Sequence, residues 1–388
     1  MTLFLISFLT LYGGMQAYAF ARLRGAFSPG QTITAILAGW MVLMTISPLL
    51  VRMAEGAGLE RTARTLAWPG YIWMGSLFIF CSALAAADTL RTAAWLSNRI
   101  FTTPIPGYLT AAITCEIALF LALLASGYAL YEARSIRTEQ VTVTTDKLPP
   151  AIRSIRVVQI SDIHVGLLFG ESRLEPVLQA VRAAHPDILV STGDLVDGRL
   201  SREDLLSHLD RMAAMIAAIP ASGGKFAVTG NHEYYAGLDQ ALEFTRKAGF
   251  TVLRDQSAAL PGGITISGVD DTAGQHRGSP AVTTPETELL RSLPPQHFHL
   301  LLKHRPLVAD TGNSHFDLQL SGHVHKGQIF PFNLLVSLRF PIPCGTTRAA
   351  NGSCIHVSRG SGTWGPPMRL LAPPEVTVID IISTSSGR

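Results

Sequence analysis

Charged side chains are scarce in this chain of 388 residues. Only 15% of the residues are Asp, Glu, Lys or Arg, whereas 47% are hydrophobic, and the formal net charge is +3. There is no basic stripe and no basic track lined with aromatic residues, which argues against a nuclease or another nucleic-acid partner. Internal repeats and low-complexity tracts are also missing. Because the chain is longer than a usual single domain, we expect two units.

Charge is almost absent from four long stretches in the N-terminal third. Residues 3–21, 25–51 and 65–87 contain none, and residues 106–131 contain only Glu116. About 20 apolar residues suffice to cross a bilayer as a helix, so we predict four membrane-spanning helices. A cleaved signal peptide is not expected, because no positive residue precedes the first run and three more runs follow it.

The few charges in this region leave two questions open. Glu116 is either a carboxylate at membrane depth that faces a partner or cavity, or a residue near a shifted helix end. The loop arginines favour an N-terminus inside the cell by five against four, which predicts that the C-terminal domain faces the cytoplasm. An external domain is the alternative.

Cysteine is scarce as well, with four residues in the chain. Cys81 and Cys115 lie in the predicted spans, whereas Cys344 and Cys354 flank a segment rich in Gly, Thr and Asn. The second pair would form a disulfide in an oxidising compartment and would be two thiols otherwise. Their oxidation state would therefore report the orientation of the domain.

Five short apolar runs in the C-terminal two-thirds each end at side chains that can bind metals. Runs of this kind, bounded by glycine and polar residues, are typical of buried strands. The runs are residues 157–161, 188–192, 226–229, 300–303 and 318–321. The side chains that follow them are Asp162, His164, Asp194, Asn231, His232, His304, His323 and His325. We expect these side chains to converge on one edge of a sheet, where open α/β proteins place their sites.

The residue types indicate which metals would bind. Asp, Asn and His offer oxygen and imidazole ligands without thiolate, a set that suits Mn, Fe, Zn or Ni in open coordination better than a closed structural zinc site. One carboxylate can bridge two cations about 3.5–4 Å apart, and such a pair holds both the attacking and the leaving oxygen of a phosphoryl displacement. We predict two divalent metal ions, Mn before Fe, Zn or Ni, with Asp194 as the bridge.

In order, the motifs read D-x-H, G-D, G-N-H-E, a lone H and G-H-x-H, and as a set they resemble the calcineurin-like metallophosphoesterase superfamily over roughly residues 150–385. The resemblance implies that the first metal is held by Asp162, His164, Asp194 and His325. It implies that the second is held by Asp194, Asn231, His304 and His323. His232 matches the non-ligand histidine that protonates the leaving oxygen or stabilises the charged transition state.

Within the superfamily the chain is similar to membrane-associated phosphodiesterases related to bacterial YkuE and YaeI. The residues that carry this similarity are 157–164, 357–364, 366–369 and 374–376. Helical periodicity over 171–184, 202–219 and 237–249 predicts helices between the strands, and therefore an α/β layered domain. The resemblance implies a four-layer α/β/β/α sandwich. The predicted organisation is a transmembrane region of about four helices at 1–132, a juxtamembrane linker at 133–154 and a metallophosphoesterase domain at 155–388.

The predicted function is that of a membrane-anchored phosphodiesterase or pyrophosphatase in which a metal-activated hydroxide attacks phosphorus. A lipid-linked phosphoester is the candidate substrate, and the expected location is the bacterial inner membrane with the catalytic domain in the cytoplasm. The alternatives are a phosphomonoesterase or protein phosphatase, and a non-catalytic membrane sensor stabilised by metal.

Three further residues near the motifs have predicted roles that support the site, and two of them have a second interpretation. Glu233 would orient groups near the site. Asp197 would orient a ligand histidine or form a turn before Gly198. Arg305 would contact phosphate or be an exposed residue at a strand end. The remaining histidines with predicted structural roles are His185, His208, His276, His297, His299, His315 and His356.

Overall fold

A computed structural model describes residues 2–102, 110–198, 203–277, 286–307, 316–349 and 352–384. The chain forms two compact units. The first comprises Met1–Tyr131 with two short later segments, Ile329–Pro331 and Gly365–Leu370. The second comprises Glu132–Gln328, Phe332–Trp364 and Leu371–Arg388. Each unit is described here on its own.

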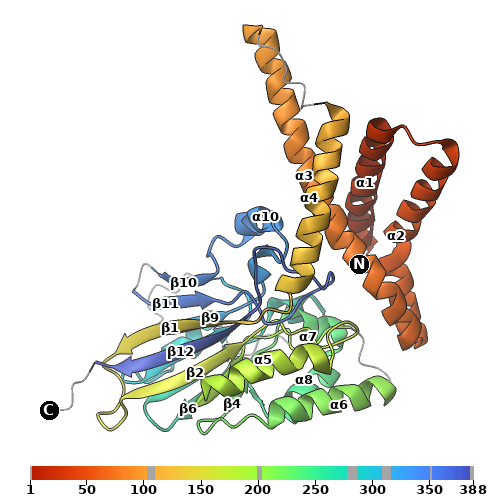
Figure 1. The fold of residues 1–388 in the computed structure, drawn as a ribbon. Helices are drawn as coiled ribbons and strands as arrows, with labels where there is room; N and C mark the ends of the chain where they lie inside the picture. Colours follow the sequence, from red (N-terminus) through yellow and green to blue (C-terminus); the bar gives the residue numbers. More distant parts are fainter. Residues whose placement is uncertain are drawn as a thin grey trace. The chain divides into compact units, whose positions relative to one another are not determined.

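The first unit is helical (Figure 1). Its helices are α1 (Thr2–Phe27), α2 (Gln31–Ala57), α3 (Glu60–Phe101) and α4 (Ala111–Glu132). Among the described residues, α2, α3 and α4 are long and apolar enough to cross a membrane, and α1, which contains the predicted span 3–21, is not one of these three. The described part of this unit therefore has three candidate spans, and four membrane-spanning helices remain a prediction.

Small residues and one polar cluster hold these helices together. A Cβ atom on Gly70 of α3 would lie 2.6 Å from the Ser47 hydroxyl of α2, so the two backbones approach closely, as is common between membrane helices. Asp88 of α3 accepts a hydrogen bond from the Tyr18 hydroxyl at 2.7 Å and pairs with Arg22 of α1 at 2.8 Å. Glu116 is exposed on the second turn of α4, which favours the interpretation of a residue near a helix end.

The two short later segments of this unit pack against the middle of α3. A Cβ on Gly75 would lie 2.7 Å from the Met368 sulfur and 3.2 Å from Ile329. Both residues belong to the apolar cluster formed by α1, α2, α3 and α4. Because Gly75 lies within the charge-free run 65–87, these segments reach the most apolar part of α3.

The second unit contains two six-stranded sheets. In spatial order the first comprises β1 (Arg137–Thr145), β12 (Glu375–Ser383), β2 (Ser154–Ile160), β3 (Ile188–Ser191), β4 (Lys225–Ala227) and β5 (Thr251–Val252). The second comprises β10 (Gly345–Arg348), β11 (Cys354–Val357), β9 (Leu318–Ser321), β8 (Phe298–Lys303), β7 (Ile264–Val269) and β6 (Gln256–Leu260). Strands β2 to β5 are parallel, as are β7, β8, β9 and β11. The five predicted strands are confirmed as β2, β3, β4, β8 and β9.

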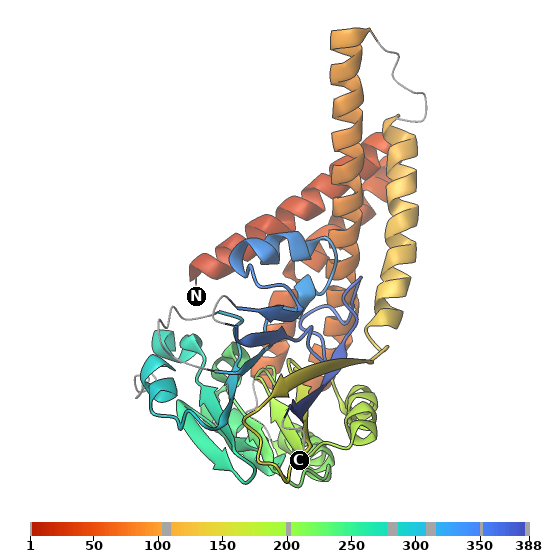
Figure 2. The ribbon, with the colours of Figure 1, turned by 90° about the vertical axis from the view of Figure 1, so that its left-hand side faces the viewer.

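Helices cover the outer faces of both sheets (Figures 1 and 2). The helices and short 3-10 turns of this unit are α5 (Glu171–Ala184), α6 (Glu203–Ala217), α7 (Asn231–Ala236), α8 (Leu238–Lys247), η2 (Thr272–Arg277), α9 (Glu286–Arg291), η3 (His325–Gly327) and α10 (Phe332–Arg339). Apolar side chains of α5, α6 and α8 pack on the first sheet, while those of α9 and α10 pack on the second. A third apolar cluster fills the space between the sheets. The implied four-layer α/β/β/α sandwich is confirmed.

Strand β1 lies within the predicted linker 133–154. It pairs in parallel with β12 along its full length, from Arg137 opposite Glu375 to Thr145 opposite Ser383. The segment that follows the membrane helices is therefore an edge strand of the first sheet. Local alternation of Val and Thr predicted the strand, but only the pairing shows that it belongs to the sandwich.

The considered disulfide between Cys344 and Cys354 does not form, and both are free thiols. Cys354 lies opposite Arg348 in the β10–β11 pair, four positions beyond Cys344. Four extended residues separate the two by about 13 Å, whereas a disulfide spans Cα atoms no more than about 7 Å apart. The oxidation state of this pair therefore does not report the orientation of the domain.

Candidate metal centre

The predicted site residues come together at the carboxyl ends of strands from both sheets. Strands β2, β3 and β4 of the first sheet lead to Asp162 with His164, to Asp194, and to Asn231 with His232. The second sheet supplies the other three residues, which follow β8 and β9 and are His304, His323 and His325. The expectation that one edge of a single sheet would hold them all is wrong. The site lies where the parallel strands of two sheets present their carboxyl ends together.

Several of these residues have a left-handed backbone conformation. Their φ angles are 52° for Asp162, 55° for His164, 53° for Asp194, 70° for His323 and 47° for His325. This region is costly for residues other than glycine, by about 1–3 kcal/mol each, and it concentrates at functional sites. Main-chain hydrogen bonds hold the strained turns, because the amides of Asp162 and His164 donate to the carbonyls of Gly193 and Asp194 at 3.0 Å each.

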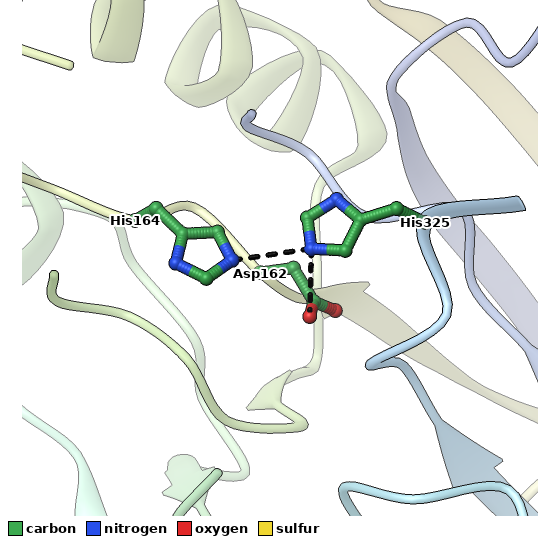
Figure 3. Close-up of side chains that lie close together, drawn as sticks. All are labelled: Asp162, His164 and His325. Atoms are coloured by element: carbon green, nitrogen blue, oxygen red, sulfur yellow. Dashed lines mark hydrogen bonds and ion pairs between the residues drawn. The ribbon is translucent and has the colours of Figure 1, made fainter. Parts of the chain in front are cut away.

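Asp162, His164 and His325 form a first group of potential metal ligands (Figure 3). The Nε2 atoms of the two histidines lie 3.1 Å apart, and His325 Nε2 lies 3.3 Å from Asp162 Oδ1. All three side chains are buried. Three donor atoms from distant parts of the sequence therefore face one small volume.

Asp194, His304 and His323 form a second group. His304 Nε2 lies 3.1 Å from His323 Nδ1, 3.3 Å from Asn231 Oδ1 and 3.3 Å from Asp194 Oδ2. The same Asp194 oxygen is 3.8 Å from His164 Nε2 of the first group. Asp194 thus lies between the two groups, at the position expected of a bridging carboxylate.

The donor atoms have the chemistry that a divalent cation requires. His304 donates its Nδ1 hydrogen to the Thr192 carbonyl at 2.8 Å, which directs the lone pair of Nε2 towards the other donors. Burial, with the charge of His232 next, lowers the pKa of His164 to about 3. His164 is therefore a neutral imidazole, and its buried Nδ1 has no hydrogen-bond partner within the described part of the chain. Burial also lowers the pKa of His323 to about 3, whereas the carboxylate of Asp194 more than offsets burial at His304 and raises its pKa to about 10. Imidazoles and carboxylates that converge in this way fit a divalent cation, which takes the place of the proton on a ligand histidine.

His232 is not part of the group around Asp194, but its donor atoms lie near those of His164 and Asp197. Its Nδ1 hydrogen donates to Asp197 at 2.9 Å, and its ring lies 4.6 Å from the ring of His164. Burial lowers the pKa of His232, but the carboxylates of Asp194 and Asp197 more than offset this and raise it to about 9. The charge of His232 in turn lowers the pKa of Asp197 to about 2, against the effect of burial. Asp197 therefore orients His232 and not a ligand histidine.

Glu233 connects two of the loops that carry site residues. Its Oε2 atom accepts hydrogen bonds from the amides of Gly230 at 2.6 Å and Asp194 at 3.0 Å, and its Oε1 accepts one from Leu195 at 2.8 Å. Burial, and then the charge of Asp194, raises the pKa of Glu233 to about 7. The side chain was expected to orient groups near the site, and its contacts are with the backbone of the Asp194 loop.

Sequence patterns did not predict several side chains that support the site. Ser161 donates a hydrogen bond to Asp162 at 2.5 Å and accepts one from Thr192 at 2.7 Å. Two aromatic rings flank His232, with centroids at 5.3 Å for Tyr235 and 5.7 Å for Trp364. The only available signal was that Ser161 and Thr192 directly precede metal-binding motifs, and no local signal indicated that Trp364 would reach His232.

Arg305 has a partner that neither of its interpretations included. Its guanidinium binds Asp271 through two hydrogen bonds, of 2.8 and 3.2 Å, and Asp271 is buried. Other histidines with predicted structural roles also have partners away from the centre, such as His299 with the Pro294 carbonyl at 2.8 Å and His208 with Glu171 at 2.9 Å. The side chain of His276 and all of His315 lie outside the described residues.

Residues 155–327 match the calcineurin-like phosphoesterase family. A protein of Aquifex aeolicus, named an uncharacterized metallophosphoesterase, is 41% identical over 264 residues, which are 68% of this chain and 98% of that protein. The chain belongs to the calcineurin-like metallophosphoesterase family. The family uses divalent metals, and this phosphoesterase has groups of side chains that could hold them.

Two further relatives bear on the membrane and on the predicted subgroup. A transmembrane protein with a metallophosphoesterase domain from zebrafish, Danio rerio, is 31% identical over 274 residues. These residues are 68% of this chain and 61% of that protein. YkuE of Bacillus subtilis, named an uncharacterized metallophosphoesterase, is 32% identical over 271 residues, which are 67% of this chain and 90% of that protein. Together with the three apolar helices, the transmembrane relative indicates that the metallophosphoesterase is membrane-associated.

Proposed function

We propose that this metallophosphoesterase hydrolyses phosphodiesters or pyrophosphates at a centre of two metals. In this proposal Asp162, His164, Asp194 and His325 hold one ion, and Asp194, Asn231, His304 and His323 hold the other. The main support is the position of Asp194, whose Oδ2 lies 3.3 Å from His304 and 3.8 Å from His164. One carboxylate oxygen within reach of both ligand groups is what a shared ligand requires.

When bound, two divalent cations supply Lewis-acid charge to the phosphoryl oxygens and lower the pKa of water. The protein holds the ligands in advance: the strained turns at Asp162 and Asp194 are fixed by main-chain hydrogen bonds. The hydrogen bond from His304 to Thr192 fixes the tautomer that leaves Nε2 free to bind a cation. Little reorganisation is then needed when substrate arrives.

In the proposed mechanism His232 donates a proton to the departing oxygen. Asp197 accepts the hydrogen on Nδ1, so Nε2 is the nitrogen left to face the leaving group. With its pKa raised to about 9, the imidazole is protonated at neutral pH and suits the role of acid better than that of base. The rings of Tyr235 and Trp364 flank the imidazole and limit the access of water to it.

The proposed location is the bacterial inner membrane, with the catalytic unit facing the cytoplasm and a lipid-linked phosphoester as substrate. Membrane association supports a substrate that is itself confined to the membrane. For such a substrate the anchor replaces a three-dimensional search by a two-dimensional one, which raises its effective concentration.

The test uses the full chain in nanodiscs, stripped by a chelator and then reloaded separately with Mn, Fe, Zn or Mg. We expect Mn to restore cleavage of bis(p-nitrophenyl) phosphate at a higher kcat/KM than that of p-nitrophenyl phosphate. His232→Asn should lower turnover by about 100- to 10,000-fold with two metals retained per chain. His185→Asn is the matched control, because His185 is an exposed helix cap with a φ of 50° that asparagine also tolerates.

Three results would contradict the proposal. A higher kcat/KM for the monoester would make the protein a phosphatase. Full metal loading with no hydrolysis of either compound would favour the metal-stabilised sensor. A pyrophosphate-linked acyl lipid left intact beside rapid cleavage of soluble diesters would remove the lipid-linked substrate while leaving the phosphodiesterase.

A further inference from the structure

Helix α10 (Phe332–Arg339) exposes an apolar face that no described element covers. Leu334 and Leu335 are each 59% exposed, and Leu338 is 82% exposed. The opposite face is anchored, because Val336 packs against the apolar cluster on the outer side of the second sheet. Residues 334, 335 and 338 fall on one side of a helix at 3.6 residues per turn. Leucines grouped in this way on a soluble surface mark an interaction site.

This face is held next to the candidate metal centre. Gly327, two residues after His325, lies so close to the backbone of Asn333 in α10 that a Cβ atom would overlap it. Beyond the other end of the helix, the ring of Phe340 lies 5.0 Å from the ring of His323. Figures 1 and 2 show α10 on the side of the unit that carries β10 and β11. Helix α10 and the histidines of the candidate metal centre are therefore close neighbours in the fold.

Helix α10 begins directly after a short segment of the membrane-associated unit. Only Pro331 and Phe330 separate the helix from Ile329, which packs on Gly75 in the charge-free run of α3. The exposed ring of Trp364 is likewise followed at once by the segment Gly365–Leu370 of the helical unit. Covalent connection thus keeps the start of α10 within a few residues of a segment that packs against a candidate membrane span.

The charge around α10 has one sign. Residues 318–374 contain no Asp or Glu, whereas five are Lys or Arg, of which Lys326 and Arg339 are exposed beside or within α10. Basic residues next to an apolar helix face favour the surface of a bilayer that contains anionic lipids, because each adds electrostatic attraction to the burial of the apolar side chains.

We propose that the apolar face of α10, formed by Leu334, Leu335 and Leu338, docks on the surface of the same bilayer that holds the membrane helices. The leucines enter the boundary between headgroups and acyl chains, and Lys326 and Arg339 contact lipid phosphates. This contact places His323 and His325 close to the headgroup layer. It depends on membrane association and not on hydrolysis, so its test is separable from that of the proposed function.

The test measures the contact in the full chain. All four native cysteines are replaced, Cys81 and Cys115 by alanine and Cys344 and Cys354 by serine. Single cysteines are then introduced as Leu334→Cys or Leu338→Cys and labelled with bimane. Nanodiscs contain phosphatidylcholine, phosphatidylglycerol and lipids with a nitroxide near the top of the acyl chain. Glu243→Cys on α8 is the matched control, since it is an exposed helical position in the same unit. We expect quenching at 334 and 338 to be several times that at 243, and to decrease when the anionic lipid is omitted.

Equal quenching at all three positions would overturn the proposal. The proposal would also be overturned if the bimane were protected from the quencher only in discs that hold two protein chains and not in discs that hold one. In that case α10 would contact a second chain. An unchanged thermal transition of each labelled variant excludes unfolding as the origin of any signal.

Discussion

A substitution at Gly322 tests whether close packing at the centre determines metal binding. Gly322 follows β9 and precedes His323, and a Cβ atom there would overlap Ser161 Oγ and the Asp162 carboxylate. Both of those residues are fully buried, and Ser161 is already held by Thr192 at 2.7 Å. In Gly322→Ala, the Asp162 carboxylate would therefore have to move.

The expected magnitude follows from the contacts that this movement breaks. Forcing a methyl group into a filled core costs about 1–3 kcal/mol. The Asp162 carboxylate also accepts hydrogen bonds from the Ser161 hydroxyl at 2.5 Å and from the His323 amide at 3.0 Å. Weakening one such charge-assisted hydrogen bond causes a further loss of about 1.5–3 kcal/mol. We expect a total loss of about 2.5–6 kcal/mol in the free energy of unfolding. Displacement of a ligand should also lower metal affinity by at least about tenfold.

The assay combines urea unfolding, elemental analysis of the purified protein and diester hydrolysis. Gly127→Ala in α4 is the matched control, because a Cβ there meets no described atom within 4 Å. It should change stability by less than about 1 kcal/mol and leave metal content unchanged. If Gly322→Ala kept its stability and its full metal content, the inference that Gly322 leaves room for Asp162 would be refuted.

Three further predictions follow from the contacts described above. Asp197→Asn should lower kcat by about 10- to 100-fold with metal content unchanged. The substitution should also lower the pKa of His232, so the loss of activity at high pH should begin at a lower pH. An unshifted pH–rate profile would argue against the role of His232 as an acid. Gly75→Leu should lower the melting temperature of the full chain in nanodiscs, because the segment packed on α3 would be displaced, whereas Gly14→Leu, which meets no described atom, should not. Burial raises the pKa of Glu375, but the imidazole of His356 and the guanidinium of Arg359 lower it below its ordinary value. The ionised carboxylate therefore stabilises the fold above about pH 4, and this stabilisation is lost as the pH falls further. Glu375→Gln should flatten acid unfolding in that range, as followed by circular dichroism.

The elements that local pattern predicted well are those with strong periodicity. Helix α5 occupies residues 171–184, the same range that apolar spacing indicated, and the strand before each metal-binding motif is present. Long charge-free runs likewise predicted the N-terminal helices. By contrast, the predicted helix over 237–249 is α8 alone, and the short helix α7 that carries His232 precedes it.

The structure changed several interpretations that depended on partners distant in the sequence. Asp197 was expected either to orient a ligand histidine or to form a turn before Gly198. It accepts hydrogen bonds from the Gly198 amide and from His232, and Arg305 binds the buried Asp271. Cys344 and Cys354 lie at different levels of one hairpin. In each case the residue type left several partners possible, and the register of strands selected one.

The sequence alone determined the set of donor atoms, the strands that precede them and the apolar runs that can cross a membrane, because each depends on residues adjacent in the chain. Only the tertiary structure decided that two sheets share the site, that Asp194 lies between both ligand groups, and that α10 leaves its leucines uncovered. These features depend on distances between residues far apart in sequence. Such distances are set by strand pairing, layer packing and strained turns, none of which leaves a local pattern.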